Sequence, residues 1–151
     1  MASLVSINIS KGGVPKRPLP SCAVTVNGLS GDRQRDLRYH GGPDRAVCLF
    51  SEELIAALQG EGHPISAGTI GENFTLRGIP WAEMVPGAKL DVGEVRIELT
   101  TYAAPCNNIA GSFQRRQIGQ VSQQANPGRS RLYARVLREG TVHVGDPVAL
   151  C

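Results

Sequence analysis

Residues 94–99 alternate strictly between charged and apolar side chains, in the order Glu94-Val95-Arg96-Ile97-Glu98-Leu99. Such period-two alternation predicts a half-buried β-strand. Pro105 has no N–H to give to a strand ladder, so this strand must end before it. Other short alternating stretches follow the same plan, and 18 Gly and 10 Pro separate them. The pattern favours many short strands over long helices.

We expect one domain over residues 1–151 with a mainly β (α+β) fold: a single compact β-barrel of short strands, closed or nearly closed, with a few short helices. The strands are expected at residues 4–9, 23–26, 46–50, 73–76, 89–92, 94–100, 132–137 and 142–150. Ser51 is a suitable N-cap for a helix that runs through Gln59. A second helix is expected over residues 106–118.

Composition and charge limit the classes of partner. The formal net charge is +3 and aromatic residues make up 5% of the chain, so neither a phosphate-tracking stripe nor a base-stacking platform is indicated. No signal peptide and no apolar membrane span is recognisable in the sequence. We therefore expect a cytoplasmic protein that binds neither nucleic acid nor membrane. The four cysteines show neither CxxC nor zinc-ligand spacing, and we expect free thiols.

Residues 31–50 combine polar donors and glycines, then change abruptly to an apolar run that begins at Ala46. Four arginines lie between residues 33 and 45, and Gly41 and Gly42 allow the backbone to approach a ligand closely. Guanidinium groups and free backbone N–H groups together suit an anion such as a phosphate. Alternatively, this is a solvated loop whose Arg and Asp side chains pair with one another.

Cys106 follows Pro105 at the end of a predicted strand and precedes a predicted helix. Oriented N–H groups at a helix start favour a thiolate over a thiol, so a reactive or metal-binding sulfur is expected here. Cys48, within an apolar run, is expected to be a small buried hydrophobic residue. Of the four cysteines, Cys106 is the one whose surroundings indicate chemistry.

With both segments in view, the chain resembles the MOSC family, which is named for the C-terminal domain of molybdenum cofactor sulfurases. The resemblance covers nearly the whole chain and rests on motifs in the family's order: residues 31–33, 40–47, 71–75, 105–106, 133–137, 140–142 and 145–148. It is closest to small stand-alone bacterial members. These lack the pyridoxal-phosphate-dependent domain of the larger sulfurases, so pyridoxal phosphate is not expected.

The resemblance implies binding of the molybdenum cofactor, a pterin dithiolene that carries a phosphate and a molybdenum centre. Cys106 would then ligate molybdenum directly or carry sulfur as a persulfide. The residues implied for cofactor binding are Lys16, Arg33, His40, Gly41, Gly42, Arg45 and Asn73. Several of these residues have a structural alternative. Arg33 pairs with a nearby Asp, His40 anchors the Gly-Gly turn or is exposed, Arg45 fixes its loop, Asn73 caps a turn, or Arg17 faces the pocket in place of Lys16.

The function implied first is an oxidoreductase that reduces N-hydroxylated compounds, with Cys106 as catalytic residue and molybdenum ligand. The second is a sulfur carrier in cofactor sulfuration. A non-catalytic cofactor-binding module and a nucleic-acid or nucleotide binder are two further alternatives, although the low aromatic content counts against the second. No electron-transfer module is recognisable in the sequence, so we expect a partner protein: an electron donor for the reductase or a cysteine desulfurase for the carrier. Arg115, Arg116, Arg129 and Arg131 are expected to form a solvated face.

Overall fold

The computed structural model describes residues 1–33 and 42–151. Its strands are β1 (Ser3–Ile9), β2 (Arg17–Leu19), β3 (Ser21–Thr25), β4 (Gly28–Leu29), β5 (Val47–Ser51), β6 (Phe74–Arg77), β7 (Lys89–Val92), β8 (Val95–Tyr102), β9 (Leu132–Arg138), β10 (Gly140–His143) and β11 (Val148–Leu150). Its helices are α1 (Glu52–Gly60) and five short 3-10 helices: η1 (Pro43–Arg45), η2 (Trp81–Glu83), η3 (Asn107–Ser112), η4 (Gln114–Arg116) and η5 (Ile118–Val121).

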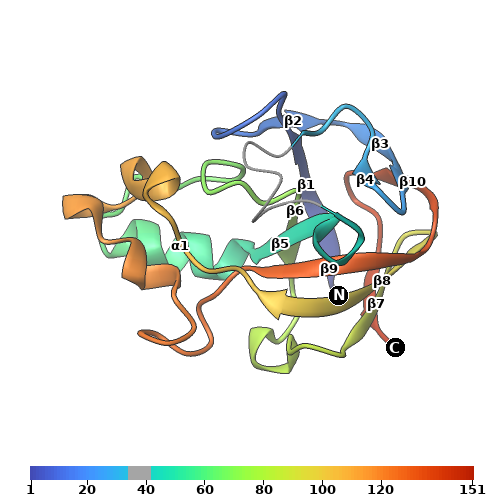
Figure 1. Cartoon of the computed structure of the whole chain (residues 1–151). Helices are drawn as coiled ribbons and strands as arrows, with labels where there is room; N and C mark the ends of the chain where they lie inside the picture. The colour runs from blue at the N-terminus through green and yellow to red at the C-terminus, as the bar shows by residue number, and fades with distance from the viewer. Residues whose placement is uncertain (34–41) are drawn as a thin grey trace.

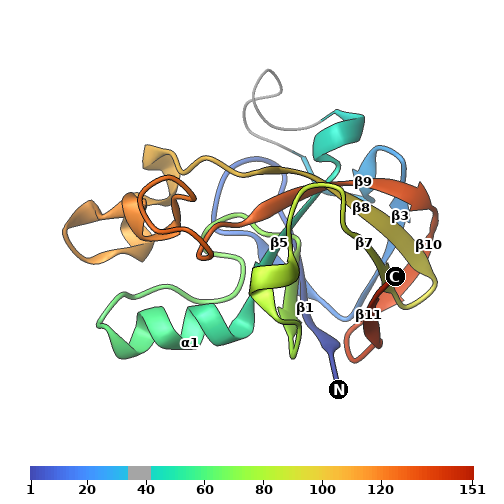
Figure 2. The ribbon, with the colours of Figure 1, turned by 90° about the horizontal axis from the view of Figure 1, so that it is seen from below.

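The strands form two sheets, in agreement with the mainly β fold expected from alternation. One sheet has eight strands in the order β11-β7-β8-β9-β5-β6-β1-β2, and the other has three in the order β10-β3-β4. Figures 1 and 2 both show the strands at one end of the molecule and α1 with η3–η5 at the other. Within the described residues, no helix is long and apolar enough to cross a membrane.

The expectation of a closed or nearly closed barrel is wrong, because the sheets are open. In the eight-stranded sheet the terminal strands β11 and β2 are not paired with each other. The bridge of Ser3 with Pro147 and three backbone hydrogen bonds, Leu4 N to Asp146 O, Gly145 N to Leu4 O and Val148 N to Ala2 O, join the start of β1 to the chain around Pro147. These contacts do not pair β11 with β2, so the sheet stays open. Alternation predicted the strands, but closure depends on strand register and tilt, which alternation does not encode.

The helix α1 connects two parallel strands, β5 and β6. The hydroxyl of Ser51 accepts a hydrogen bond from Leu54 N at 3.1 Å, which confirms the predicted N-cap. Ile55 and Leu58 are buried and form the inward face. Because β5 and β6 are parallel, both strands begin at the same edge of the sheet, and this edge lies beside the pocket described below.

The second predicted helix, over residues 106–118, is not a continuous helix. The chain forms the three separate 3-10 helices η3, η4 and η5 instead. Arg115 and Arg116 have φ values of 52° and 56°, in the left-handed region, which breaks any helix at that point. Ile109 and Phe113 are buried as expected, in a cluster with Phe50 and Leu58. Apolar packing against β5 and α1 therefore holds this segment in place.

We predict that Gly68→Ala strongly destabilises the fold. Gly68 has a φ of +84°, and a Cβ there would collide with the backbone oxygen of Lys16. Gly87 also has a positive φ, +94°, but open space around it, so Gly87→Ala measures the backbone strain alone. We expect Gly87→Ala to lower the free energy of unfolding by about 1–2 kcal/mol and Gly68→Ala by clearly more. Equal losses in urea unfolding would contradict the close approach of these two segments.

Candidate functional site

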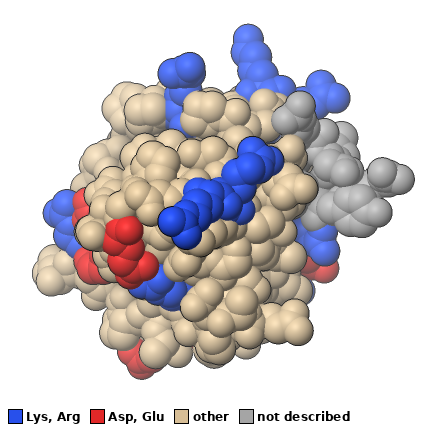
Figure 3. Space-filling model, turned by 90° about the vertical axis from the view of Figure 1, so that its left-hand side faces the viewer, with Lys and Arg blue, Asp and Glu red and all other residues tan. Residues whose placement is uncertain are grey.

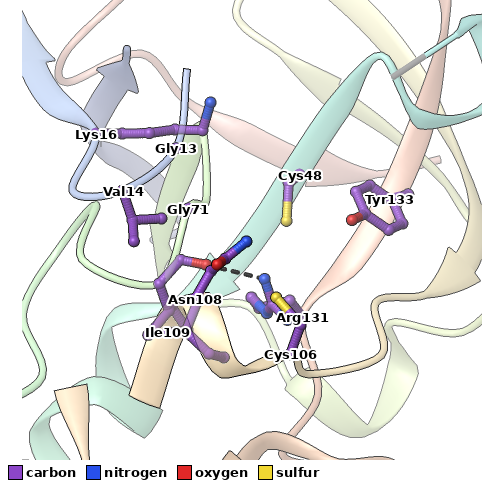
Figure 4. Close-up of a pocket in the computed structure, with 11 residues that line it drawn as sticks. Gly13, Val14, Lys16, Cys48, Gly71, Cys106, Asn108, Ile109, Arg131 and Tyr133 are labelled. Atoms are coloured by element: carbon purple, nitrogen blue, oxygen red, sulfur yellow. Dashed lines mark hydrogen bonds between the residues drawn. The ribbon is translucent and has the colours of Figure 1, made fainter. Parts of the chain in front are cut away.

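A pocket lies where five segments meet, between the turn after β1, the segment before β6, β5, the start of β9 and the start of η3 (Figure 4). Its lining residues are Gly13, Val14, Lys16, Cys48, Ile70, Gly71, Cys106, Asn108, Ile109, Arg131 and Tyr133. Two thiols, one phenol and two cationic side chains therefore share one concave site, which is a usual setting for ligand binding.

Cys106 is the residue immediately before η3 and has extended backbone angles, φ −133° and ψ 169°. Its carbonyl accepts a hydrogen bond from Ile109 N, the first bond of η3. The residue is partly exposed, so its sulfur can be reached from the pocket. The predicted setting, a cysteine after a strand and before a helix, is confirmed, although that helix has only six residues.

Cys48 is buried on β5, with 3% of its surface exposed, and packs with Ala103 and Tyr133. Figure 4 shows its sulfur and that of Cys106 on the same side of the pocket. Burial raises the pKa of the Cys48 thiol to about 11. It is therefore a neutral, buried thiol near pH 7, as expected from its apolar run. Burial also raises the pKa of Tyr133, which keeps that phenol protonated.

Arg131 is one of several pocket residues that the sequence did not predict as part of the site. It was expected on a solvated face, but it is only 4% exposed. Its guanidinium donates to Ile70 O at 2.9 Å and to Ala104 O at 3.4 Å, and so joins two walls of the pocket. In the sequence, Arg131 comes directly before β9, the strand that pairs with β8, and β8 leads to Cys106. This neighbourhood could have indicated that Arg131 belongs to the pocket. Arg115 and Arg116 are exposed, as expected.

Lys16 lies in the pocket wall, but its charge is already paired. Its Nζ lies 2.6 Å from Asp32 Oδ1, and both side chains are 4% exposed. Asp32 Oδ2 accepts a hydrogen bond from Asn73 Nδ2 at 2.9 Å. The amide of Asn73 also donates to Asn8 O and accepts from Cys48 N. Asn73 is fully buried and its amide is hydrogen-bonded to protein groups, so it supports the pocket wall from the protein interior.

Three of the remaining predicted site residues, Arg33, Gly42 and Arg45, are described by the structure and are not among the residues that line the pocket. Arg33 is exposed, and its backbone N–H donates to Ser10 O. Gly42 has a φ of 80° and precedes η1. The guanidinium of Arg45 lies 5.6 Å from the centre of the Tyr133 ring, so Arg45 covers a residue that does line the pocket. His40 and Gly41 fall outside the described residues.

Glu72 is fully buried beside the pocket, next to the lining residue Gly71. Its Oε2 accepts a hydrogen bond from the Thr75 hydroxyl at 3.1 Å. Burial raises the pKa of its carboxyl to about 7, although nearby backbone N–H groups and the charge of Arg131 oppose the rise. Glu72 can therefore change its charge near neutral pH, which sequence inspection alone did not indicate.

The side of the pocket that carries Cys106 has a positive bias. No Asp or Glu occurs between Glu98 and Glu139, and Arg115 and Arg116 of η4 are exposed. The charges of Arg129, Arg135 and Arg138 in the same stretch are compensated by carboxylates. Figure 3 shows the end formed by α1 and η3–η5, where Lys and Arg side chains project from a mostly uncharged surface and Asp and Glu side chains are few. An anionic ligand or an acidic partner would be attracted to this side.

A bare metal ion has no ready-made site in residues 1–33 and 42–151, because no three His, Cys, Asp or Glu side chains cluster there. A metal that arrives with its own soft ligands needs fewer protein donors, and one thiolate can complete its coordination. The pocket's donor set, one partly exposed thiol beside a buried guanidinium, suits an anionic ligand that carries such a metal.

We predict that thiol reagents distinguish the two pocket cysteines. Near neutral pH, iodoacetamide should modify Cys106 before Cys48, because Cys48 is buried and its pKa is about 11. Peptide mass mapping after short exposure measures the order, with Cys151, which is exposed, as an internal standard for accessibility. A Cys106 thiol that reacts only after unfolding would contradict the open pocket.

We predict that Glu72 makes stability depend on pH. Its folded pKa, about 7, lies above the ordinary value of 4.5, so the folded state holds the proton more tightly. The resulting stabilisation is complete below pH 4.5 and is lost as the pH rises through 7. The loss should be roughly 2–4 kcal/mol, at about 1.4 kcal/mol per pKa unit. Urea unfolding of Glu72→Gln should lack this component, and an unchanged profile would contradict the titration.

Comparison with known proteins identifies the family. The model of the MOSC domain matches residues 36–149. The uncharacterized protein YflK of Bacillus subtilis (strain 168) is 32% identical over 140 residues, which cover 91% of this chain and 62% of YflK. Protein YiiM of Escherichia coli (strain K12) is 28% identical over 131 residues, which cover 84% of this chain and 58% of YiiM. The chain thus spans less than two thirds of these relatives.

Solved structures of related proteins show the same fold. The crystal structure of YiiM from Geobacillus stearothermophilus superimposes with a TM-score of 0.76 and 26% identity, covering 100% of this chain and 75% of that one. The YUAD protein from Bacillus subtilis shares the fold alone, with a TM-score of 0.78 at 17% identity over 98% of this chain and 94% of that one. By sequence and by fold, this chain belongs to the MOSC domain family.

Proposed function

We propose that this protein binds the molybdenum cofactor in the pocket and that Cys106 supplies a sulfur ligand to its molybdenum. The observation that carries the proposal is the contrast between the two pocket thiols. Cys106 is partly exposed at the pocket, whereas Cys48 is buried with a raised pKa. A soft metal centre requires an accessible sulfur, and Cys106 meets this requirement.

The other pocket residues would bind and orient the cofactor. The buried guanidinium of Arg131 favours anionic groups such as the cofactor's phosphate or dithiolene. Its Nε has no hydrogen-bond partner among the described residues, which leaves one donor for a ligand or a water. Lys16 is paired with Asp32, so its contribution would be the weaker one. When bound, the cofactor would supply two-electron redox chemistry.

The activity that we propose for the loaded protein is reduction of N-hydroxylated compounds. The N–O bond breaks, two electrons and two protons enter, and an amine and water leave. A partner protein would deliver the electrons, and the positively biased surface near η3–η5 suits an acidic donor. The role of the chain itself would be to hold Cys106 at the metal and to shape the pocket around the substrate.

A sulfur carrier is the second candidate. The observation that favours it is the exposure of Cys106, because a cysteine desulfurase must reach the acceptor thiol. In that reaction the Cys106 thiolate takes the terminal sulfur of the desulfurase persulfide, and the desulfurase leaves as a thiolate. Mass spectrometry after incubation with a desulfurase and cysteine distinguishes the two: a carrier gains one sulfur atom at Cys106.

We predict that Arg131→Gln weakens cofactor retention far more than Arg33→Ala. Arg131 lies in the pocket, whereas Arg33 is exposed outside it. Loss of one charge-assisted contact should reduce affinity about ten- to a hundredfold. Released pterin, measured by fluorescence after gel filtration of protein from a cofactor-producing host, is the readout. Arg96→Gln is the matched control, since Arg96 pairs with Asp91 outside the pocket.

The opposite order would reject this assignment. If Arg33→Ala loses the pterin and Arg131→Gln retains it, Arg33 holds the anion instead. If wild-type protein retains pterin and molybdenum but reduces no N-hydroxylated compound with a chemical reductant, a non-catalytic binding module is favoured.

A further inference from the structure

Four buried ionisable side chains surround the Cys48 thiol at the pocket, and all four act electrostatically on its pKa; we call them the buried charged layer: Lys16, Asp32, Arg131 and Glu72. The first two neutralise each other in a direct ion pair of 2.6 Å. Arg131 and Glu72 are left, and within the described residues Arg131 pairs with carbonyl oxygens and with no carboxylate. The net charge of this layer is therefore +1 when Glu72 is protonated and zero when Glu72 is ionised.

Two buried polar atoms in the described part of the chain have no hydrogen-bond partner, and both belong to this layer. They are Glu72 Oε1 and Arg131 Nε. One is an acceptor and the other a donor, and Arg131 also binds Ile70 O, two residues before Glu72. Buried polar atoms without partners are uncommon in folded proteins and often mark a functional group or a bound water. Their occurrence together indicates a site that a ligand or a proton completes.

The surroundings of Glu72 contain few other charges. In β6 the neutral Thr75 donates to Oε2, and in β1 the neutral amide of Asn8 donates to Glu72 O. The titratable group that faces it from β5 is Cys48, whose thiol stays neutral near pH 7. From the start of β9 the charge is that of Arg131. Arg131 is thus the main cation acting on Glu72 among residues 1–33 and 42–151.

We propose that Glu72 sets the net charge of an anion site at Arg131, so that an anion entering the pocket is bound together with one proton taken up by Glu72. An anion beside Arg131 offsets the positive charge that favours the Glu72 carboxylate. Burial without that compensation favours the neutral acid. Conversely, protonated Glu72 leaves Arg131 uncompensated and ready for an anion. This inference rests on the proposed function only in that the pocket accepts an anionic group.

The two equilibria are linked, so each strengthens the other to the same extent. Anion affinity should be highest below the pKa of Glu72, about 7. Above that pH it should fall by up to roughly tenfold per pH unit, because each bound anion then requires one proton from solution.

Isothermal titration calorimetry with sulfate tests the proposal, because sulfate remains a dianion across this pH range. Titrations of cofactor-free protein in two buffers with different ionisation enthalpies give the number of protons taken up. We expect uptake of up to one proton near neutral pH and affinity that falls as the pH rises. Absence of proton uptake on sulfate binding would overturn the coupling, and absence of sulfate binding at every pH would overturn the anion site.

Variants assign the proton to Glu72. Glu72→Gln, which imitates the neutral acid, should bind sulfate without proton uptake and keep its affinity at high pH. Glu98→Gln is the matched control, because Glu98 is a partly buried glutamate paired with Arg135. It should behave as wild type. Wild-type pH dependence in Glu72→Gln would overturn the proposal, and if that variant does not fold, the proton count in wild type still decides.

The outcome does not depend on molybdenum. A protein that binds sulfate with proton uptake but never retains pterin would reject the proposed function and leave this inference intact. A protein that retains pterin but binds sulfate without a proton would do the reverse. Each of the two proposals can therefore be rejected without rejecting the other.

Discussion

The carboxylate of Asp32 joins three segments that are far apart in the sequence, and the pocket depends on this junction. Oδ1 accepts from Lys16 Nζ at 2.6 Å and from Ser10 N at 2.9 Å, and Oδ2 accepts from Asn73 Nδ2 at 2.9 Å. Asn73 extends the network to β5 through Cys48 N. The turn after β1, the segment before β6 and the strand that carries Cys48 are thereby fixed relative to one another. Removal of this one carboxylate would leave a buried ammonium unpaired.

The opposite wall of the pocket is held by a different kind of interaction. The η3–η5 segment has few hydrogen bonds to the sheets, but Ile109, Phe113 and Val121 pack with Phe50 and Leu58 in a separate apolar cluster. Arg131 joins the two walls through Ile70 O and Ala104 O. Cys106 lies between the hydrogen-bonded wall of the pocket and the apolar cluster. Its position is therefore determined by hydrogen bonds on one side and by apolar packing on the other.

Local sequence patterns correctly predicted the features that depend on neighbouring residues, such as strands, a helix start and a turn. Period-two alternation located β7 and β8, and the Ser51 hydroxyl marked the start of α1. Turn chemistry located Cys106 between a strand and a helix. Alternation could not predict whether the sheet closes, because closure depends on register over many strands. The burial of Arg131 was missed for a related reason: carbonyls at residues 70 and 104 accept its hydrogen bonds.

The most direct test of the account is X-ray absorption at the molybdenum edge on protein purified from a host that makes the cofactor, compared with Cys106→Ser. If Cys106 ligates the metal, the variant that still retains cofactor should show one sulfur neighbour fewer around molybdenum than the wild type, with an oxygen neighbour in its place. Equal sulfur counts in the two proteins would contradict direct ligation by Cys106.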